Sequence, residues 1–178
     1  MAEPVRPDDL EKAATRLAEI LGDDGMMVGG LAVAAWGYVR ATDDVDFVAN
    51  LTAATVLERL KAAGISARVL KGSVLDGDIA WYIKGRLGEI TFDILPPVVP
   101  LDFERAVTVT LARGKAVRVV DLDGLLRLKL RAGGPQDLLD AAQLLRKHPE
   151  LLDGIRPVAE AYSEWERLES WLNDPRLR

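Results

Sequence analysis

The apolar residues of this chain follow two different periods, and the change from one to the other marks the predicted elements. Apolar residues three or four apart indicate an amphipathic helix, whereas short continuous or alternating apolar runs indicate a strand. Residues such as Thr52, a helix cap, and Gly64, a helix breaker, mark where helices begin and end. The first part of the chain therefore predicts helices at 8–21, 31–39 and 52–63 and strands at 26–28 and 44–48.

The middle and the last part of the chain differ in the same way. The middle is rich in short β-like runs separated by glycine and proline, and helical spacing returns after residue 120. We expect strands at 65–70, 79–83 and 89–95, a turn at 84–88, and a hairpin of 107–112 and 115–120 about Arg113-Gly114. Further helices are expected at 122–132, after the Gly-Gly-Pro turn at 133–135, and from about Ile155 with Pro157 near its start.

This order of elements predicts an α+β fold of the α/β type, in which a mixed β-sheet is flanked by helices. We divide the chain into a core, residues 1–120, and a C-terminal helical segment, residues 121–178, packed on the core as a single compact unit. A length of 178 residues suits one such domain. The last helix is spaced to pack either on the core or on another subunit, so a homodimer stays open.

Composition narrows the chemistry. The chain has no cysteine and one histidine, which removes disulfides and leaves almost no ligands for a zinc-type site. No apolar run approaches the length of a membrane span and no secretion signal is recognisable, so we expect a cytoplasmic protein with no membrane partner. The net charge of −5 argues against broad nucleic-acid binding, but residues 105–131 carry a local net charge of +5. This segment either meets phosphate or is only a solvated face.

The first candidate site lies where the strand at 26–28 runs through Gly29-Gly30 into a helix. Glycines at such a point let the backbone approach a ligand with its N–H groups unpaired, so an anion is expected there. Asp44 and Asp46 follow on the next predicted strand, and the alternation of side chains along a strand places both on one face. Two like charges so close strain each other unless a cation lies between them, and carboxylate oxygens favour Mg²⁺ or Mn²⁺.

Two further charged residues stand in apolar surroundings. Asp93 interrupts an apolar strand, which needs an explanation; taken alone, it is a strand-end residue that faces solvent. Lys129 lies in the middle of the apolar stripe of the helix at 122–132, where it either extends to solvent or meets an anion. Asp137, in the first turn of the next helix, is expected to complement the helix dipole and to pair with Lys129.

The glycine pair and the carboxylates belong to a longer motif: Gly-Gly, a short helix, and then Arg-x-Thr-x-Asp-hydrophobic-Asp at residues 40–46. This motif resembles the signature of the nucleotidyltransferase superfamily that includes DNA polymerase beta. It is similar in particular to small bacterial members, among them the nucleotidyltransferase toxins of abortive-infection systems. The resemblance covers most of residues 26–146, and it implies the nucleotidyltransferase fold.

The resemblance also implies a two-metal site and a triphosphate site. Asp44 and Asp46 would hold both Mg²⁺ (or Mn²⁺) ions, and Asp93 would be a ligand of the catalytic metal and the general base for the incoming hydroxyl. The residues implied to contact the nucleoside triphosphate (NTP) are Gly29, Gly30, Arg40, Thr42 and Lys129.

Three interpretations stay open, and the second of them is motivated by Gly134 and Gln136, which stand where the family commonly has Arg and Lys. The first is a Mg²⁺-dependent enzyme that moves a nucleoside monophosphate (NMP) from an NTP to a hydroxyl or phosphate acceptor, with a tRNA end as one candidate. The second is a nucleotide- or metal-binding protein without turnover, acting through a partner as half of a toxin–antitoxin pair. The third is a structural domain with an incidental Asp-x-Asp, which predicts that Asp44 and Asp46 lie far from Asp93.

Overall fold

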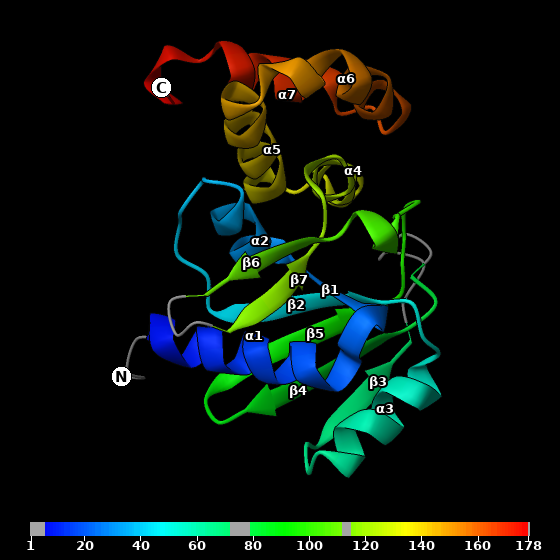
Figure 1. Cartoon of the computed structure of the whole chain (residues 1–178). Helices are drawn as coiled ribbons and strands as arrows, with labels where there is room; N and C mark the ends of the chain where they lie inside the picture. The colour runs from blue at the N-terminus through cyan, green and yellow to red at the C-terminus, as the bar shows by residue number, and fades with distance from the viewer. Residues whose placement is uncertain (1–5, 72–78, 112–114, 178) are drawn as a thin grey trace.

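The computed structural model describes residues 6–71, 79–111 and 115–177. The strands in these ranges are Gly25–Val28 (β1), Asp44–Ala49 (β2), Ala67–Leu70 (β3), Tyr82–Leu87 (β4), Ile90–Leu95 (β5), Val107–Thr110 (β6) and Ala116–Val119 (β7). They form one mixed sheet in the order β3-β4-β5-β2-β1-β7-β6 (Figure 1). The pairs β2–β5 and β1–β7 are parallel, and the other neighbouring strands are antiparallel.

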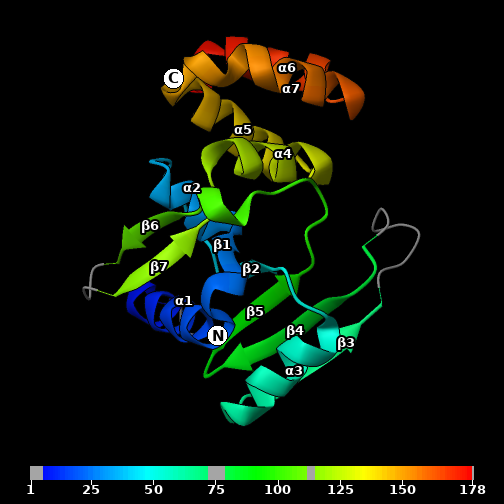
Figure 2. The same ribbon diagram turned by 45° about the vertical axis from the view of Figure 1, so that its right-hand side comes forward.

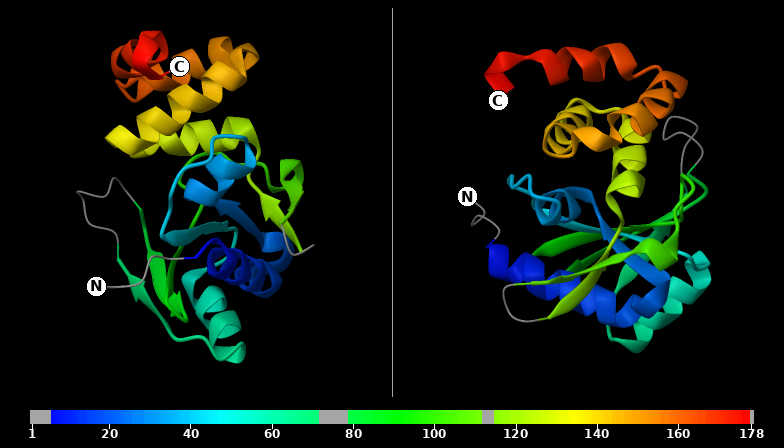
Figure 3. Two further views of the ribbon diagram at one scale, coloured as in Figure 1. Left: turned by 90° about the vertical axis from the view of Figure 1, so that its left-hand side faces the viewer. Right: turned by 45° about the horizontal axis from the view of Figure 1, so that its top comes forward.

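The helices cover the sheet from both sides, and the last helices of the chain extend beyond it. Helices α1 and α3 pack on one face, α2 and α4 lie on the other, and α5, α6 and α7 form a further layer beyond α4 (Figures 1 and 3). Their bounds are Pro7–Leu21 (α1), Gly29–Ala35 (α2), Ala53–Ala62 (α3), Leu122–Ala132 (α4), Pro135–Lys147 (α5), Leu152–Ala161 (α6) and Trp165–Asn173 (α7).

Alternation along β2 separates the core from the candidate site. Val45 and Phe47 are fully buried, while Asp44 and Asp46 alternate with them and face the side of the sheet that carries α2 and α4. The core facing α1 is completed by that helix's apolar stripe, which comprises Leu10, Ala13, Ala14, Leu17 and Leu21. One period-2 strand thus buries apolar side chains on one face and presents carboxylates on the other.

The structure confirms the α+β fold with a mixed sheet, but two local predictions were wrong. The strand predicted at 79–83 begins only at Tyr82 and continues through the predicted turn to Leu87; the chain turns at Gly88-Glu89, where Gly88 adopts a φ of 61°. The predicted last helix is two helices, α6 and α7, separated near Ser163, whose φ is 59°, and Pro157 lies inside α6. A left-handed conformation at a serine has no strong sequence signal.

Smaller differences concern the ends of elements. The predicted helix at 31–39 starts earlier and ends at Ala35, followed by Trp36, whose indole Nε1–H donates to the carbonyl of Val120, and by Gly37 at a φ of 98°. The expected hairpin tip at Arg113-Gly114 lies outside the described residues. Within the described ranges, none of the helices has both the length and the apolar character needed to cross a membrane.

Candidate active site

Three aspartates lie on one face of the sheet because of the register between β2 and β5. These strands are parallel, and Asp46 is the direct partner of Asp93, while Asp44 is the partner of Thr91. Paired residues on neighbouring strands project to the same side, so Asp44, Asp46 and Asp93 share one face. This contradicts the interpretation that the Asp-x-Asp motif lies far from Asp93.

The electrostatics of Asp46 reflect this convergence. Burial and, to a smaller extent, the negative charges of Asp44 and Asp93 together raise the pKa of Asp46 to about 7, against a partial opposing effect of Lys129 and Lys84. A carboxylate that holds its proton near neutral pH is one whose negative charge is poorly compensated. The arrangement therefore favours a cation or a proton at this point.

Neighbouring side chains hold the other two aspartates. The ammonium of Lys84 lies 3.0 Å from Oδ2 of Asp93, and the hydroxyl of Thr42 donates to Oδ1 of Asp44 at 2.9 Å. Within residues 6–71, 79–111 and 115–177, no three acidic or histidine side chains are close enough to ligate one metal ion in this conformation. The all-oxygen donor set fits Mg²⁺ or Mn²⁺ in type, and the excess negative charge at Asp46 fits a cation, but the ligands are not gathered in advance.

The glycine pair is required by the close approach of α2 to the carboxylates. Gly29 adopts a φ of 66°, and a Cβ atom there would lie 1.9 Å from Oδ2 of Asp46. A Cβ atom at Gly30 would lie 2.7 Å from the hydroxyl oxygen of Thr42. The glycines thus allow the backbone to pass directly beside the motif that follows them in the sequence.

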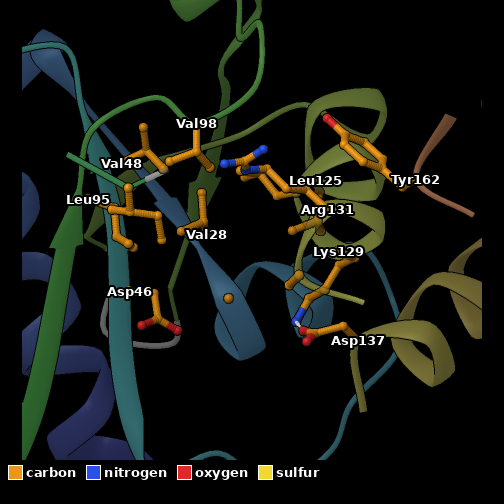
Figure 4. Close-up of a pocket in the computed structure, with 14 residues that line it drawn as sticks. Val28, Asp46, Val48, Leu95, Val98, Leu125, Lys129, Arg131, Asp137 and Tyr162 are labelled. Carbon is orange, nitrogen blue, oxygen red and sulfur yellow. Dashed lines mark hydrogen bonds and ion pairs between the residues drawn. The ribbon is translucent and has the colours of Figure 1, made fainter. Parts of the chain in front are cut away.

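A pocket of about 570 Å³ lies between this face of the sheet and the C-terminal helices (Figure 4). Its polar lining comes from Asp46 on the sheet and from Lys129, Arg131 and Asp137 on α4 and α5. The rest of the lining is mainly apolar, with Val28, Val48, Leu95, Val98, Leu125 and Leu128, together with Tyr162. Figure 4 shows Asp46 projecting from the sheet into the same space that Lys129 borders from α4.

Lys129, which the sequence placed in an apolar stripe, meets anions of the protein itself. Its side chain is buried, and its ammonium lies 2.9 Å from Oδ1 of Asp137 and 2.9 Å from Oδ2 of Asp140. Burial alone would lower the pKa of Lys129, but Asp137 and Asp140 outweigh it and raise the pKa. The predicted pairing of Lys129 with Asp137 is present.

Asp140 connects the core to the helical segment, and the sequence reasoning assigned it no role. It is fully buried on α5 and accepts hydrogen bonds from Nε of Arg40 at 2.7 Å and Nη2 of Arg40 at 2.8 Å, a bidentate pair. Gln136 donates to its Oδ1 at 2.9 Å. Burial would raise the pKa of Asp140, but the hydrogen bonds from Arg40 and Lys129 lower it. The available signal was an acidic residue among the apolar positions of α5.

The predicted nucleotide-contacting residues therefore fall into two groups. Gly29 and Lys129 line the pocket beside Asp46. Arg40 is turned toward Asp140, and Thr42 toward Asp44 and Gly30. A nucleotide contact by any of these residues stays a prediction.

Comparison with known proteins gives matches in structure only. No protein-family model matches the chain, and no curated protein matches it. The structure is similar to that of ANT(2'')-Ia in complex with adenylyl-2''-tobramycin, with a TM-score of 0.56 and 14% identity over 85% of this chain and 97% of that chain. It is also similar to a nucleotidyltransferase-like protein from Paracoccidioides brasiliensis, with a TM-score of 0.56 and 19% identity over 95% of this chain and 94% of that chain. For a candidate nucleotidyltransferase from Thermotoga maritima, the TM-score is 0.58 and the identity 15%, over 83% of this chain and 97% of that chain.

These likenesses show that the chain has the nucleotidyltransferase fold, as its motif predicted. The likeness covers most of this chain and nearly the whole of each neighbour. At such low identities it speaks for the fold alone, so the activity has to be argued from the site.

Proposed function

We propose that this protein is a Mg²⁺-dependent nucleotidyltransferase that moves NMP from an NTP to a hydroxyl or phosphate acceptor. The observation that carries the proposal is the in-register pair Asp46 and Asp93, of which Asp46 lines a pocket bordered on its other side by Lys129. A carboxylate on one wall and a buried cation on the other suit a metal-bound polyphosphate between them.

The proposed roles follow from where each side chain lies. Asp44, Asp46 and Asp93 would hold Mg²⁺ or Mn²⁺, which when bound would neutralise charge on the reacting phosphate. Lys129 would exchange part of its pairing with Asp137 for the triphosphate, and Gly29 and Gly30 leave room for it beside Asp46. Arg40 and Lys129 both pair with Asp140, which keeps the guanidinium of Arg40 close to the ammonium of Lys129. Arg40 would add its positive charge to that of Lys129 beside the triphosphate.

The transfer itself balances as an in-line displacement. The acceptor oxygen forms a bond to the α-phosphorus while the bond to the bridging oxygen of the β-phosphate breaks, and pyrophosphate leaves. Asp93 takes the proton of an acceptor hydroxyl. The ammonium of Lys84 lies 3.0 Å from Oδ2 of this carboxylate.

A second candidate function is supported by the ion pairs. Both cations that were expected to meet phosphate, Arg40 and Lys129, are engaged by Asp140, and residues 134 and 136 add no positive charge. Such a reduced positive charge would be sufficient for a protein that binds a nucleotide or metal without turnover and acts through a protein partner, such as an antitoxin.

Thermal melts with each NTP and Mg²⁺ separate these functions from a purely structural domain. A ligand that binds only the folded state raises its melting temperature by mass action. We expect protection of the parent that requires both NTP and Mg²⁺, loss of protection in Asp44→Asn/Asp46→Asn, and retention in Asp43→Asn, whose exposed side chain precedes β2. Equal protection of all three proteins would contradict the proposed site.

Label transfer from the NTP then distinguishes turnover from binding. The parent is incubated with Mg²⁺ and each α-labelled NTP in turn, alone and with total RNA. Label transferred by the parent and not by Asp44→Asn/Asp46→Asn supports the transferase. Protection without transfer to any acceptor favours the binding protein.

A further inference from the structure

A row of charged side chains continues across the sheet from the candidate active site to its edge. The register pairs Asp46 with Asp93, Asp93 with Lys84, and Lys84 with Arg68. All four side chains therefore lie on one face, in the order carboxylate, carboxylate, ammonium, guanidinium. The charge changes sign between β5 and β4.

A second row runs beside the first and repeats the change of sign. Asp44 pairs with Thr91, and Thr91 pairs with Arg86. Tyr82 also lies on this face, two residues before Lys84, and its ring centroid is 5.9 Å from the Lys84 ammonium. We name Arg68, Tyr82, Lys84 and Arg86 the β4 strip.

The β4 strip lies on an open part of the sheet. Helix α3 packs on β3 and β4 from the opposite face, while α4 and the later helices lie over the other half of the sheet (Figure 2). Arg68, Lys84, Arg86 and Thr91 are all exposed. A groove of about 640 Å³ follows these residues and ends at Asp93, and it is separate from the pocket under α4.

The pairing of these cations leaves them available to an external anion. Arg86 is paired with Glu89 at 3.0 Å, and both side chains are exposed, where such a pair contributes little free energy. Lys84 is exposed as well, although its partner Asp93 is partly buried. Arg68 forms no ion pair within the part of the chain that the structure describes. A polyanion that brings several phosphates can therefore replace these contacts.

We propose that the β4 strip binds the acceptor of the transfer, and that this acceptor is the 3′ end of a single-stranded nucleic acid. Alternate residues on a strand are about 6.7 Å apart, close to the separation of successive phosphates in an extended strand. Cations beside an aromatic ring combine the two contacts that single strands offer, phosphate and an unpaired base. A terminal hydroxyl that follows the strip arrives at Asp93.

Other acceptors fit this surface less well. A cationic acceptor is repelled by three basic side chains, and a small phosphorylated acceptor uses only one of the two rows. A duplex presents its bases stacked in its interior, where Tyr82 cannot reach them, and the net charge of −5 opposes a broad duplex footprint. This inference rests on the proposed function for the reaction, but binding to the strip can be measured without it.

The test is fluorescence anisotropy of a labelled single-stranded RNA oligonucleotide without NTP. The variant Arg68→Gln/Arg86→Gln leaves Lys84 and the carboxylates in place. Its matched control is Arg6→Gln/Arg16→Gln, which removes the same charge from the residue that precedes α1 and from α1 itself, on the opposite face of the sheet. We expect roughly tenfold weaker binding by the strip variant and parent-like binding by the control. The salt slope of the strip variant should be shallower by about 0.7 for each phosphate that it no longer neutralises.

Two further readouts locate a failure. Tyr82→Leu is expected to weaken binding and Tyr82→Phe to preserve it. Protection by NTP and Mg²⁺ in thermal melts is expected to stay at the parent's level in Arg68→Gln/Arg86→Gln. If the parent itself shows no such protection, the proposed function is contradicted, whatever the result for RNA binding. Equal RNA affinity of the strip variant and the control, or tighter binding of duplex than of single strand, would overturn the inference.

Discussion

Asp46 and Asp93 are direct partners on two neighbouring parallel strands, although 46 residues separate them in the chain. The pairing places a carboxylate beside another carboxylate in a partly buried position, and burial, together with the charges of Asp44 and Asp93, raises the pKa of Asp46 to about 7. A folded domain gains no stability from such a pair of like charges. This unfavourable contact supports the proposal that a cation binds between the carboxylates.

The stability of the metal-free protein should therefore fall as the pH rises. Because the pKa of Asp46 is higher in the folded state than its ordinary value of 3.8, the folded state binds the proton more tightly than the unfolded state. The contribution of Asp46 to the free energy of unfolding is full below about pH 4 and is lost as the pH rises to about 7, by on the order of 1 kcal/mol per pH unit. Urea unfolding in EDTA from about pH 5 to about pH 8 measures this slope.

The variant Asp46→Asn isolates this contribution, because its amide carries no titrating proton. We expect its slope to be shallower than that of the parent, its free energy of unfolding to be higher at the alkaline end, and Asp43→Asn to behave like the parent. Mg²⁺ should flatten the slope of the parent by competing with the proton. An Asp46→Asn slope as steep as the parent's would show that the pKa of Asp46 is not raised.

Gly29→Ala should damage the site more than a comparable glycine substitution elsewhere. Gly29 and Gly64 both have positive φ, so each substitution carries similar backbone strain, about 1–2 kcal/mol. Only at Gly29 would the new Cβ atom overlap Asp46, since nothing lies within 4 Å of one at Gly64. We expect Gly29→Ala to lose about 1–3 kcal/mol more in urea unfolding and to lose NTP protection. Equal losses in the two variants would contradict the close approach.

Asp140→Asn should be strongly destabilising. It removes the buried anion that compensates Arg40 and Lys129, and the loss of one partner from a buried ion pair lowers the free energy of unfolding by about 3–5 kcal/mol. The control is Asp153→Asn, on the exposed side of α6, which should be neutral. In a double-mutant cycle, Arg40→Met should cost much less in the Asp140→Asn background than in the parent. Additive losses would show that the two side chains are not coupled.

Gln136→Lys should strengthen NTP binding. Gln136 is exposed near Lys129, and its amide already donates to Asp140, a contact that an ammonium can keep. The added charge should lower the dissociation constant of an NTP with Mg²⁺ by roughly threefold, and Gln136→Glu should raise it. Titration calorimetry provides the values. The same constant for both variants would show that the triphosphate lies away from this end of α5.

The sequence predicted those parts of the site that depend on local pattern. Alternation along β2 placed Asp44 and Asp46 on one face, and the resemblance added Asp93 and Lys129. It did not reveal the role of Asp140, because the contact with Arg40 joins residues 100 positions apart on two different elements. No local period encodes such a contact.

The turn predicted at 84–88 was wrong for a physical reason that also concerns the β4 strip. Lys84, Gly85 and Arg86 resemble a turn because they are charged and contain a glycine. They form a strand because their charged side chains point to open solvent, while the ring of Phe92 occupies the space beside Gly85. The same exposure makes these cations available to a ligand.

The most direct test of the central claim compares NTPs labelled at the α-phosphate with NTPs labelled at the γ-phosphate, in the presence of Mg²⁺ and RNA. We predict that the parent transfers the α-label to an acceptor and releases the γ-label as pyrophosphate, while Asp44→Asn/Asp46→Asn does neither and Asp43→Asn does both. Transfer of the γ-label to an acceptor, or the same α-label transfer by parent and double variant, would contradict the assignment of these carboxylates to nucleotidyl transfer.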